Sequence, residues 1–142
     1  DICKKKFSDD NVIIVCAEIE DQIMNLQTND RDEFMQESGI ENTGLDNLIK
    51  TGYKTLGLST FFTSGPEESR AWTIKKNSSA ADAAGVIHSD FKKKFIRAET
   101  VSCDDFINYK GFNECKNEGK LRLEGKEYIV KDGDVMFFRT GA

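Results

Sequence analysis

The sequence lacks the apolar segments that membrane-spanning and secreted proteins need. Its longest uninterrupted apolar run, Val12 to Ala17, is far shorter than the roughly 20 residues of a membrane-spanning helix. No charged segment followed by an apolar one opens the chain, as a secretory signal would require. We therefore expect a soluble protein of the cytoplasm with no membrane partner.

Residues that bind metals or act as nucleophiles are also scarce. The four cysteines stand singly, and His88 is the only histidine, so zinc-site spacing is absent and reduced, partly buried thiols are expected. Asp132 and Asp134 flank Gly133, which favours a tight turn over a calcium loop, because such a loop needs more oxygen ligands. His88 is favoured as a structural or surface-recognition residue over a catalytic base. We predict no metal site and no catalytic residue.

A phosphate-binding loop of the form G-x-x-x-x-G-K-[ST] is missing as well. Gly119-Lys120 and Gly125-Lys126 lack both the partner glycine and the following hydroxyl. Without backbone N–H groups and a lysine around the β- and γ-phosphates, a protein has no site for phosphoryl transfer. The chain alone is therefore predicted to hydrolyse no nucleotide and to hold no cofactor.

What the sequence does contain is charge, unevenly distributed over 142 residues. Its 20 Lys and Arg and 25 Asp and Glu give a net charge of −5. Residues 1–57 hold 6 basic and 12 acidic side chains, whereas residues 58–142 hold 14 and 13. The overall acidity argues against a protein that coats nucleic acid, and no DNA partner is expected. The second part still has enough cations for one basic face.

The first part of the chain is predicted to contain one strand and two helices. The β-branched run from Asn11 to Ala17 is typical of a strand buried on both faces of a parallel sheet. Its neighbours would precede Asp1, so residues 1–27 are interpreted as the end of a truncated α/β domain. A short helix over Arg31 to Glu37 and an amphipathic helix from Asn42 or Thr43 to Gly57 then form a helical connector, residues 28–57.

Residues 58–142 alternate between strand and helix patterns. A helix is expected near Ala80 to Phe91, capped by Ser78 or Ser79, with short helices after Cys103 and over Asn113 to Lys120. The last two strands should flank the tight turn from Lys131 to Asp134. The order predicts a small α+β domain with helices on one face of a mixed sheet. The expected strands are Ser59–Thr63, Arg70–Lys75, Phe95–Val101, Leu123–Val130 and Asp134–Arg139.

Several long sequence segments resemble the C-terminal part of the YchF-type Obg-like ATPases, an Obg-related GTPase/ATPase family. The resemblance runs in collinear order from about Asn11 to Phe138. It rests on VIIVCAEIE (12–20), RDEFM (31–35), residues 44–58, TSGPEESRAWTI (63–74), AGVIHSDF (84–91), FIRAET (95–100), DDF (104–106) and EGKEYIVKDGDVM (124–136).

The resemblance implies that residues 58–142 form the family's TGS domain, which has a β-grasp, ubiquitin-like fold. It further implies that the parent protein binds and hydrolyses ATP or GTP with Mg²⁺ through motifs that precede Asp1. Part of that site falls in this chain: Cys16, Ala17 and Glu18 resemble the turn that contacts the base in the full-length protein. The alternative is that Cys16 is simply a buried strand residue.

A group of cations is the candidate binding surface. Folding is expected to gather these residues beside Trp72 and Phe95, which suits phosphate contact with base stacking, although a solvated surface is the simpler interpretation. Because the family's β-grasp modules are regarded as RNA or ribosome contacts, we predict a regulatory module that binds RNA or the ribosome. The group comprises Arg70, Lys75, Lys76, Lys92, Lys93, Lys94 and Arg97.

The alternative function is a protein-interaction module that binds no RNA. In that case the sheet would dock on its own N-terminal ATPase domain or on a protein partner. Apolar residues such as Phe61 and Phe62 would form the contact, and docking would persist at high salt.

Overall fold

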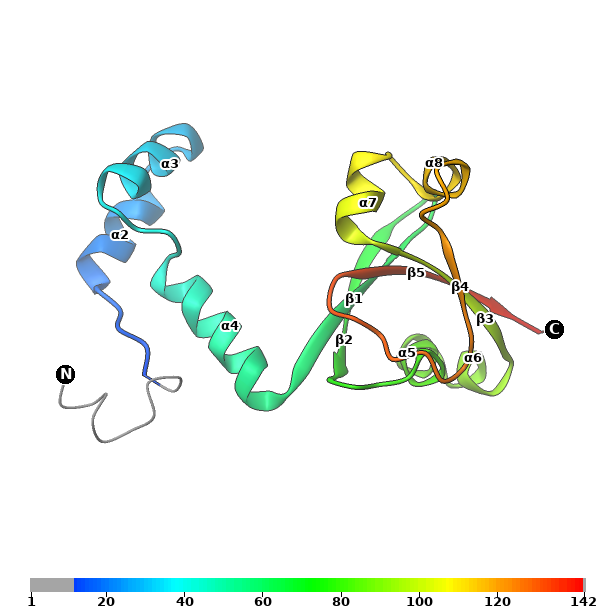
Figure 1. Cartoon of the computed structure of the whole chain (residues 1–142). Helices are drawn as coiled ribbons and strands as arrows, with labels where there is room; N and C mark the ends of the chain where they lie inside the picture. The colour runs from blue at the N-terminus through cyan, green and yellow to red at the C-terminus, as the bar shows by residue number, and fades with distance from the viewer. Residues whose placement is uncertain (1–11, 142) are drawn as a thin grey trace. The chain divides into compact units, whose positions relative to one another are not determined.

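The structure is a computed structural model that describes residues 12–141 and divides the chain after Leu56 into two compact units (Figure 1). The first unit contains helices α2 (Ala17–Asn25), α3 (Thr28–Glu37) and α4 (Gly44–Leu56). Thr43 caps the start of α4, because its hydroxyl accepts a hydrogen bond from the Asp46 amide at 3.1 Å. Within the described part of the chain, no helix has the length and apolarity needed to cross a bilayer.

The strand expected at the start of the first unit is not formed. Residues 12–16 have no regular secondary structure, and α2 begins at Ala17; Asn11 lies outside the described residues. A buried parallel strand needs hydrogen-bonded neighbours on a sheet. The described residues of this unit include no other strand, so the apolar run has nothing to pair with.

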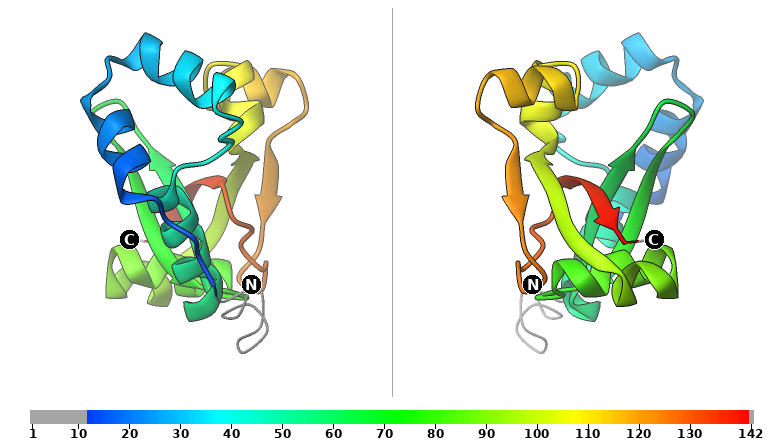
Figure 2. Two further views of the ribbon diagram at one scale, coloured as in Figure 1. Left: turned by 90° about the vertical axis from the view of Figure 1, so that its left-hand side faces the viewer. Right: turned by 90° about the vertical axis from the view of Figure 1, so that its right-hand side faces the viewer.

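The second unit is built on a five-stranded mixed sheet of order β2-β1-β5-β3-β4 (Figure 2). The central strands β1 and β5 run parallel, and every other neighbouring pair is antiparallel. This arrangement is that of a β-grasp fold, as expected. The strands are β1 (Leu58–Ser64), β2 (Ser69–Lys75), β3 (Phe95–Ser102), β4 (Arg122–Glu124) and β5 (Asp134–Thr140).

Helices cover both faces of this sheet, not one as predicted. On one face α5 (Ala80–Ile87) and α6 (Ser89–Lys93) pack over a core that includes Met136. On the other face α7 (Cys103–Asn108) and α8 (Phe112–Asn117) pack over a smaller core that includes Val135. Consecutive strand residues point to opposite faces, so a strand that buries both Val135 and Met136 must be covered on both sides.

Two predicted elements are shorter than expected. The helix expected over Ala80 to Phe91 is broken at His88 into α5 and α6. The strand expected over Leu123 to Val130 shrinks to β4, which pairs with β3 and forms no hairpin with β5. Residues 125–130 contact the start of α5 instead: the Ala80 amide donates to the Tyr128 carbonyl at 2.8 Å.

Candidate binding surface

The corner between α5 and α6 is held by a capping box and an ion pair. The Ser79 hydroxyl accepts from the Asp82 amide at 3.2 Å and donates to the Asp82 carboxylate at 2.7 Å. Lys92 on α6 reaches back to the same carboxylate at 2.6 Å. Its stem crosses Gly85, where a Cβ would lie 3.2 Å from the Lys92 Cβ. Lys92 and Ser79 together lower the pKa of Asp82 below its ordinary value.

His88 occupies the break between the two helices and caps the second. Its Nδ1 accepts a hydrogen bond from the Asp90 amide at 3.2 Å, and its backbone amide donates to the Ala84 carbonyl at the end of α5. The extended backbone of His88, with φ −157° and ψ 138°, separates α5 from α6. The imidazole therefore has a local structural role, one of the two roles that the sequence favoured over a catalytic one.

Cations gather where α6 leads into β3. Lys93 lies 3.9 Å from the Asp90 carboxylate. Lys94 and Arg97 are exposed, and neither side chain forms an ion pair with any residue that the structure describes. Arg97 is the register partner of Arg139 on β5. We call this set the basic end; it comprises Lys92, Lys93, Lys94, Arg97 and Arg139.

Arg139 was not singled out in the sequence, and its environment explains why it joins the basic end. Its Nε donates to Glu99 at 3.0 Å, and its guanidinium lies 4.4 Å from the centre of the Phe137 ring. The register of β3 and β5 places Arg139 beside Arg97, a contact between residues 42 positions apart that no local pattern predicts.

Lys75 and Lys76 lie at the opposite end of the sheet from Arg97. Lys75 is in register with Leu58 at the start of β1, and four residues along that strand Phe62 is in register with Val135. A further four residues along β5 lead to Arg139 and so to Arg97. At about 3.3 Å per residue, the path along the two strands from Lys75 to Arg97 is roughly 26 Å long.

The aromatic residues predicted to stack on bases are not free to do so. Phe95 is 8% exposed and belongs to the core. Trp72 is half-buried, its indole N–H donates to the Thr63 hydroxyl at 2.9 Å, and the guanidinium of Arg70 lies 4.6 Å from its ring centre. Arg70 is thus fixed on the edge strand β2, away from the basic end. Four of the seven predicted cations follow one another from α6 into the start of β3, but Arg97 points to the sheet face opposite α6, because its neighbour Ala98 faces the core under α5 and α6. The stacking prediction is wrong for Phe95.

The predicted base-contact turn lies at the start of α2. Cys16 precedes the helix as its N-cap position without a side-chain cap, and Ala17 and Glu18 form the first turn. All three residues are exposed, so the alternative of a buried Cys16 is wrong. Contact with a nucleotide base by this turn stays a prediction.

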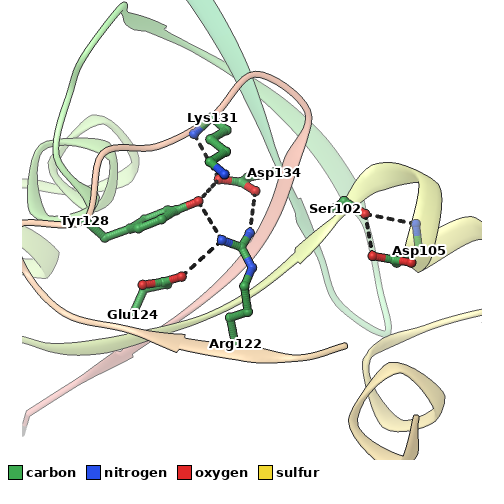
Figure 3. Close-up of polar contacts among 7 residues, drawn as sticks. All are labelled: Ser102, Asp105, Arg122, Glu124, Tyr128, Lys131 and Asp134. Carbon is green, nitrogen blue, oxygen red and sulfur yellow. Dashed lines mark hydrogen bonds and ion pairs between the residues drawn. The ribbon is translucent and has the colours of Figure 1, made fainter. Parts of the chain in front are cut away.

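A partly buried polar network that the sequence did not predict lies beneath the final turn (Figure 3). The Asp134 side chain is 3% exposed and accepts hydrogen bonds from Arg122 at 2.9 Å, from the Tyr128 hydroxyl at 2.8 Å and from the Lys131 amide at 2.9 Å. Arg122 also donates to Glu124 at 3.1 Å. Burial, with Asp134 nearby, raises the pKa of Tyr128 above its ordinary value.

This network ties β4, β5 and the loop between them into one support for the turn at residues 131–134. The turn also binds β1 through two hydrogen bonds. Asp132 accepts one from the Thr60 amide at 2.7 Å, and the Gly133 amide donates one to the Thr60 carbonyl at 2.8 Å. The turn interpretation of Asp132 and Asp134 is therefore confirmed. The described residues contain no group of three or more His, Cys, Asp or Glu arranged to hold a metal. One signal for the network was present: an acidic residue opens β5 directly before four apolar residues.

Comparison with known proteins decides the family. Residues 58–141, more than half of the chain, match the family model YchF-GTPase_C, described as a protein of unknown function (DUF933). The chain belongs to the YchF family. It is 57% identical over 127 residues to the ribosome-binding ATPase YchF of Escherichia coli O157:H7, covering 89% of this chain and 35% of that protein. With the ribosome-binding ATPase YchF of Bacillus subtilis it shares 53% identity over 128 residues, covering 90% and 35%.

A solved structure of the family agrees with the fold. The YchF GTPase of Schizosaccharomyces pombe superposes with a TM-score of 0.78 at 34% identity, covering 96% of this chain and 36% of that one. The chain thus spans about a third of the length of the YchF relatives that it matches. The fold and the family predicted from the sequence are both confirmed.

Proposed function

We propose that this chain is the ribosome-binding, regulatory part of a cytoplasmic YchF-type ATPase, and that its β-grasp unit, a TGS domain, contacts ribosomal RNA through the basic end. Nucleotide hydrolysis, with ATP or GTP and Mg²⁺, belongs to sequence outside this chain, since the chain has no phosphate-binding loop. The bacterial relatives described above are named as ribosome-binding ATPases.

The basic end differs from Lys75 and Lys76, which are also exposed and unpaired among the described residues, by combining free cations with paired ones. Its free members are Lys94, which follows α6, and Arg97 on β3; both are exposed, and neither forms an ion pair with a described residue. Lys92 and Lys93 flank them on α6, already held in place by Asp82 and Asp90. A cluster that combines fixed and free cations suits a phosphate backbone, because the fixed members cost little side-chain entropy to order.

The alternative, docking on the family's own ATPase domain or on a protein through Phe61 and Phe62, has less support. Phe61 is 0% exposed and part of the main core, and Phe62 packs beside α7 and α8 on the other face. Neither ring offers the open apolar surface that this alternative requires.

Salt dependence tests the proposed RNA contact. The 142-residue chain is sedimented with purified bacterial ribosomes at increasing salt, and the bound fraction gives the association constant. With three or four phosphate contacts, the logarithm of that constant should fall against the logarithm of the salt concentration with a slope of about −2 to −3. Binding that is strong and independent of salt would contradict the RNA contact and favour apolar docking.

A further inference from the structure

An apolar groove of about 410 Å³ opens beside the β1–β2 hairpin, next to the basic end, because its lining residue Phe137 lies under the guanidinium of Arg139. It lies between the hairpin turn, α5, α6 and the middle of β5. Its walls are formed by Thr63, Ser64, Gly65, Pro66, Glu67, Glu68, Trp72, Ile87, Phe91, Met136, Phe137 and Phe138.

The groove exists because the two central strands separate. β1 and β5 each have seven residues, yet they pair in register only at Phe62 and Val135. Beyond that point β5 turns away from the hairpin (Figure 2). Core side chains form the floor of the groove, with Met136 and Phe138 from β5 and Phe91 from α6. Met136 is fully buried, and the two phenylalanine rings are half-buried.

The chemistry of the walls is apolar with a negative rim. Of the residues that line the groove, only Glu67 and Glu68 are ionisable, and both are exposed without an ion pair to any described residue. Two arginines contact lining residues from outside the groove; Arg139 is paired with a carboxylate, whereas Arg70 has no ion pair with a described residue. Arg70 lies over Trp72, and Arg139 lies over Phe137 and binds Glu99.

We propose that this groove binds a basic peptide segment of a protein partner, with one or two apolar side chains in the groove and flanking lysines or arginines beside Glu67 and Glu68. Charge complementarity selects this occupant, since opposite charges at the rim of a contact steer association and fix its register. An RNA strand would bring phosphates against the same two carboxylates, which repel them. The inference goes beyond the proposed RNA contact and does not depend on it.

Trp72 reports directly on occupancy, because it lines the groove and is the only tryptophan of the chain. The intact chain is titrated with the peptide acetyl-KKKLLKKK-amide while tryptophan emission is recorded. We expect a saturable change in emission that weakens as salt is raised. The peptides acetyl-KKKSSKKK-amide and acetyl-EEELLEEE-amide, which lack the apolar anchor and the positive charge respectively, should give at most a weak response.

Matched charge variants separate the groove from general electrostatics. The double variant Glu67→Gln, Glu68→Gln should bind the first peptide about fivefold more weakly, the effect of losing two exposed ion pairs. The double variant Glu118→Gln, Glu127→Gln changes the net charge equally at exposed sites outside the groove and should bind as the unmodified chain does. Equal weakening in both variants, no response to the first peptide, or a response to oligouridine in its place would each overturn the inference.

Discussion

At the scale of single residues, the buried Asp134 carboxylate depends on several hydrogen-bond partners. It is buried, and its charge is balanced by Arg122, which also contacts Glu124 and the face of the Tyr128 ring at 5.4 Å. Such a network is stable only when every member is satisfied, since a buried charge that loses its partner is strongly destabilising. Tyr128 completes it by donating one hydrogen bond and accepting another.

The Tyr128 hydroxyl should therefore contribute to stability in a manner that depends on pH. Tyr128→Phe should lower the free energy of unfolding at pH 7 by about 1 to 2 kcal/mol, because Asp134 and Arg122 each lose a hydrogen bond. The folded-state pKa of Tyr128 is raised, mainly by burial, above the unfolded value near 10. The hydroxyl's contribution is thus present below about pH 10 and is lost as the pH rises through the folded-state pKa.

Urea unfolding followed by Trp72 emission at pH 7 and above pH 10 measures this difference for the second unit. Tyr109→Phe is the matched control, because the Tyr109 hydroxyl makes no hydrogen bond with the residues that the structure describes. An equal loss in both variants at pH 7, or a Tyr128 contribution that grows at alkaline pH, would show that the network does not act as described.

At the scale of elements, the α5–α6 corner decides where the cations of the basic end lie. The capping box of Ser79 and Asp82 fixes the start of α5, and Lys92 brings α6 back to the same carboxylate. His88 sets the angle between the helices by leaving helical geometry. Lys93 and Lys94 follow directly, so a change at the start of α5 reaches the surface that is proposed to contact RNA.

Ser79→Ala should lower the free energy of unfolding by about 1 kcal/mol, the usual cost of losing an N-cap side chain. The Asp82 carboxylate would then keep Lys92 but lose the hydroxyl, so the corner should loosen without unfolding. Chemical denaturation monitored by Trp72 emission gives the value. Ser89→Ala, at an exposed residue whose hydroxyl forms no hydrogen bond within the described chain, should change it by less than about 0.5 kcal/mol.

At the scale of the whole molecule, the sequence predicted the order and type of most elements of the second unit. Alternation and turn residues located β1, β2, β3 and β5, because these strands each have a buried face. The same local patterns could not predict which strands pair with each other. The last two predicted strands looked like a hairpin because they are adjacent in sequence, yet β3 lies between them in the sheet.

The arrangement of the candidate site also depends on strand pairing, which the sequence did not predict. A list of cations by sequence cannot show that Lys75 lies at the far end of the sheet from Arg97, since strand direction and register decide that distance. Local chemistry was easier to predict: Ser79 as a cap and the turn before Asp134 both depend on neighbours within three residues. Asp134 also binds Arg122 and Tyr128, which lie outside the turn, and no local pattern in the sequence predicts these two contacts.

Paired charge reversals test the central claim, that the basic end is where this YchF-family chain meets ribosomal RNA. Ribosome binding is measured as a function of salt for the variants Lys94→Glu, Arg97→Glu and Lys75→Glu, Lys76→Glu, which make equal charge changes at opposite ends of the sheet. The account predicts that the first pair weakens binding and makes the salt slope shallower by about 2, while the second leaves both nearly unchanged. Equal effects of the two pairs, or no effect of the first, would contradict it.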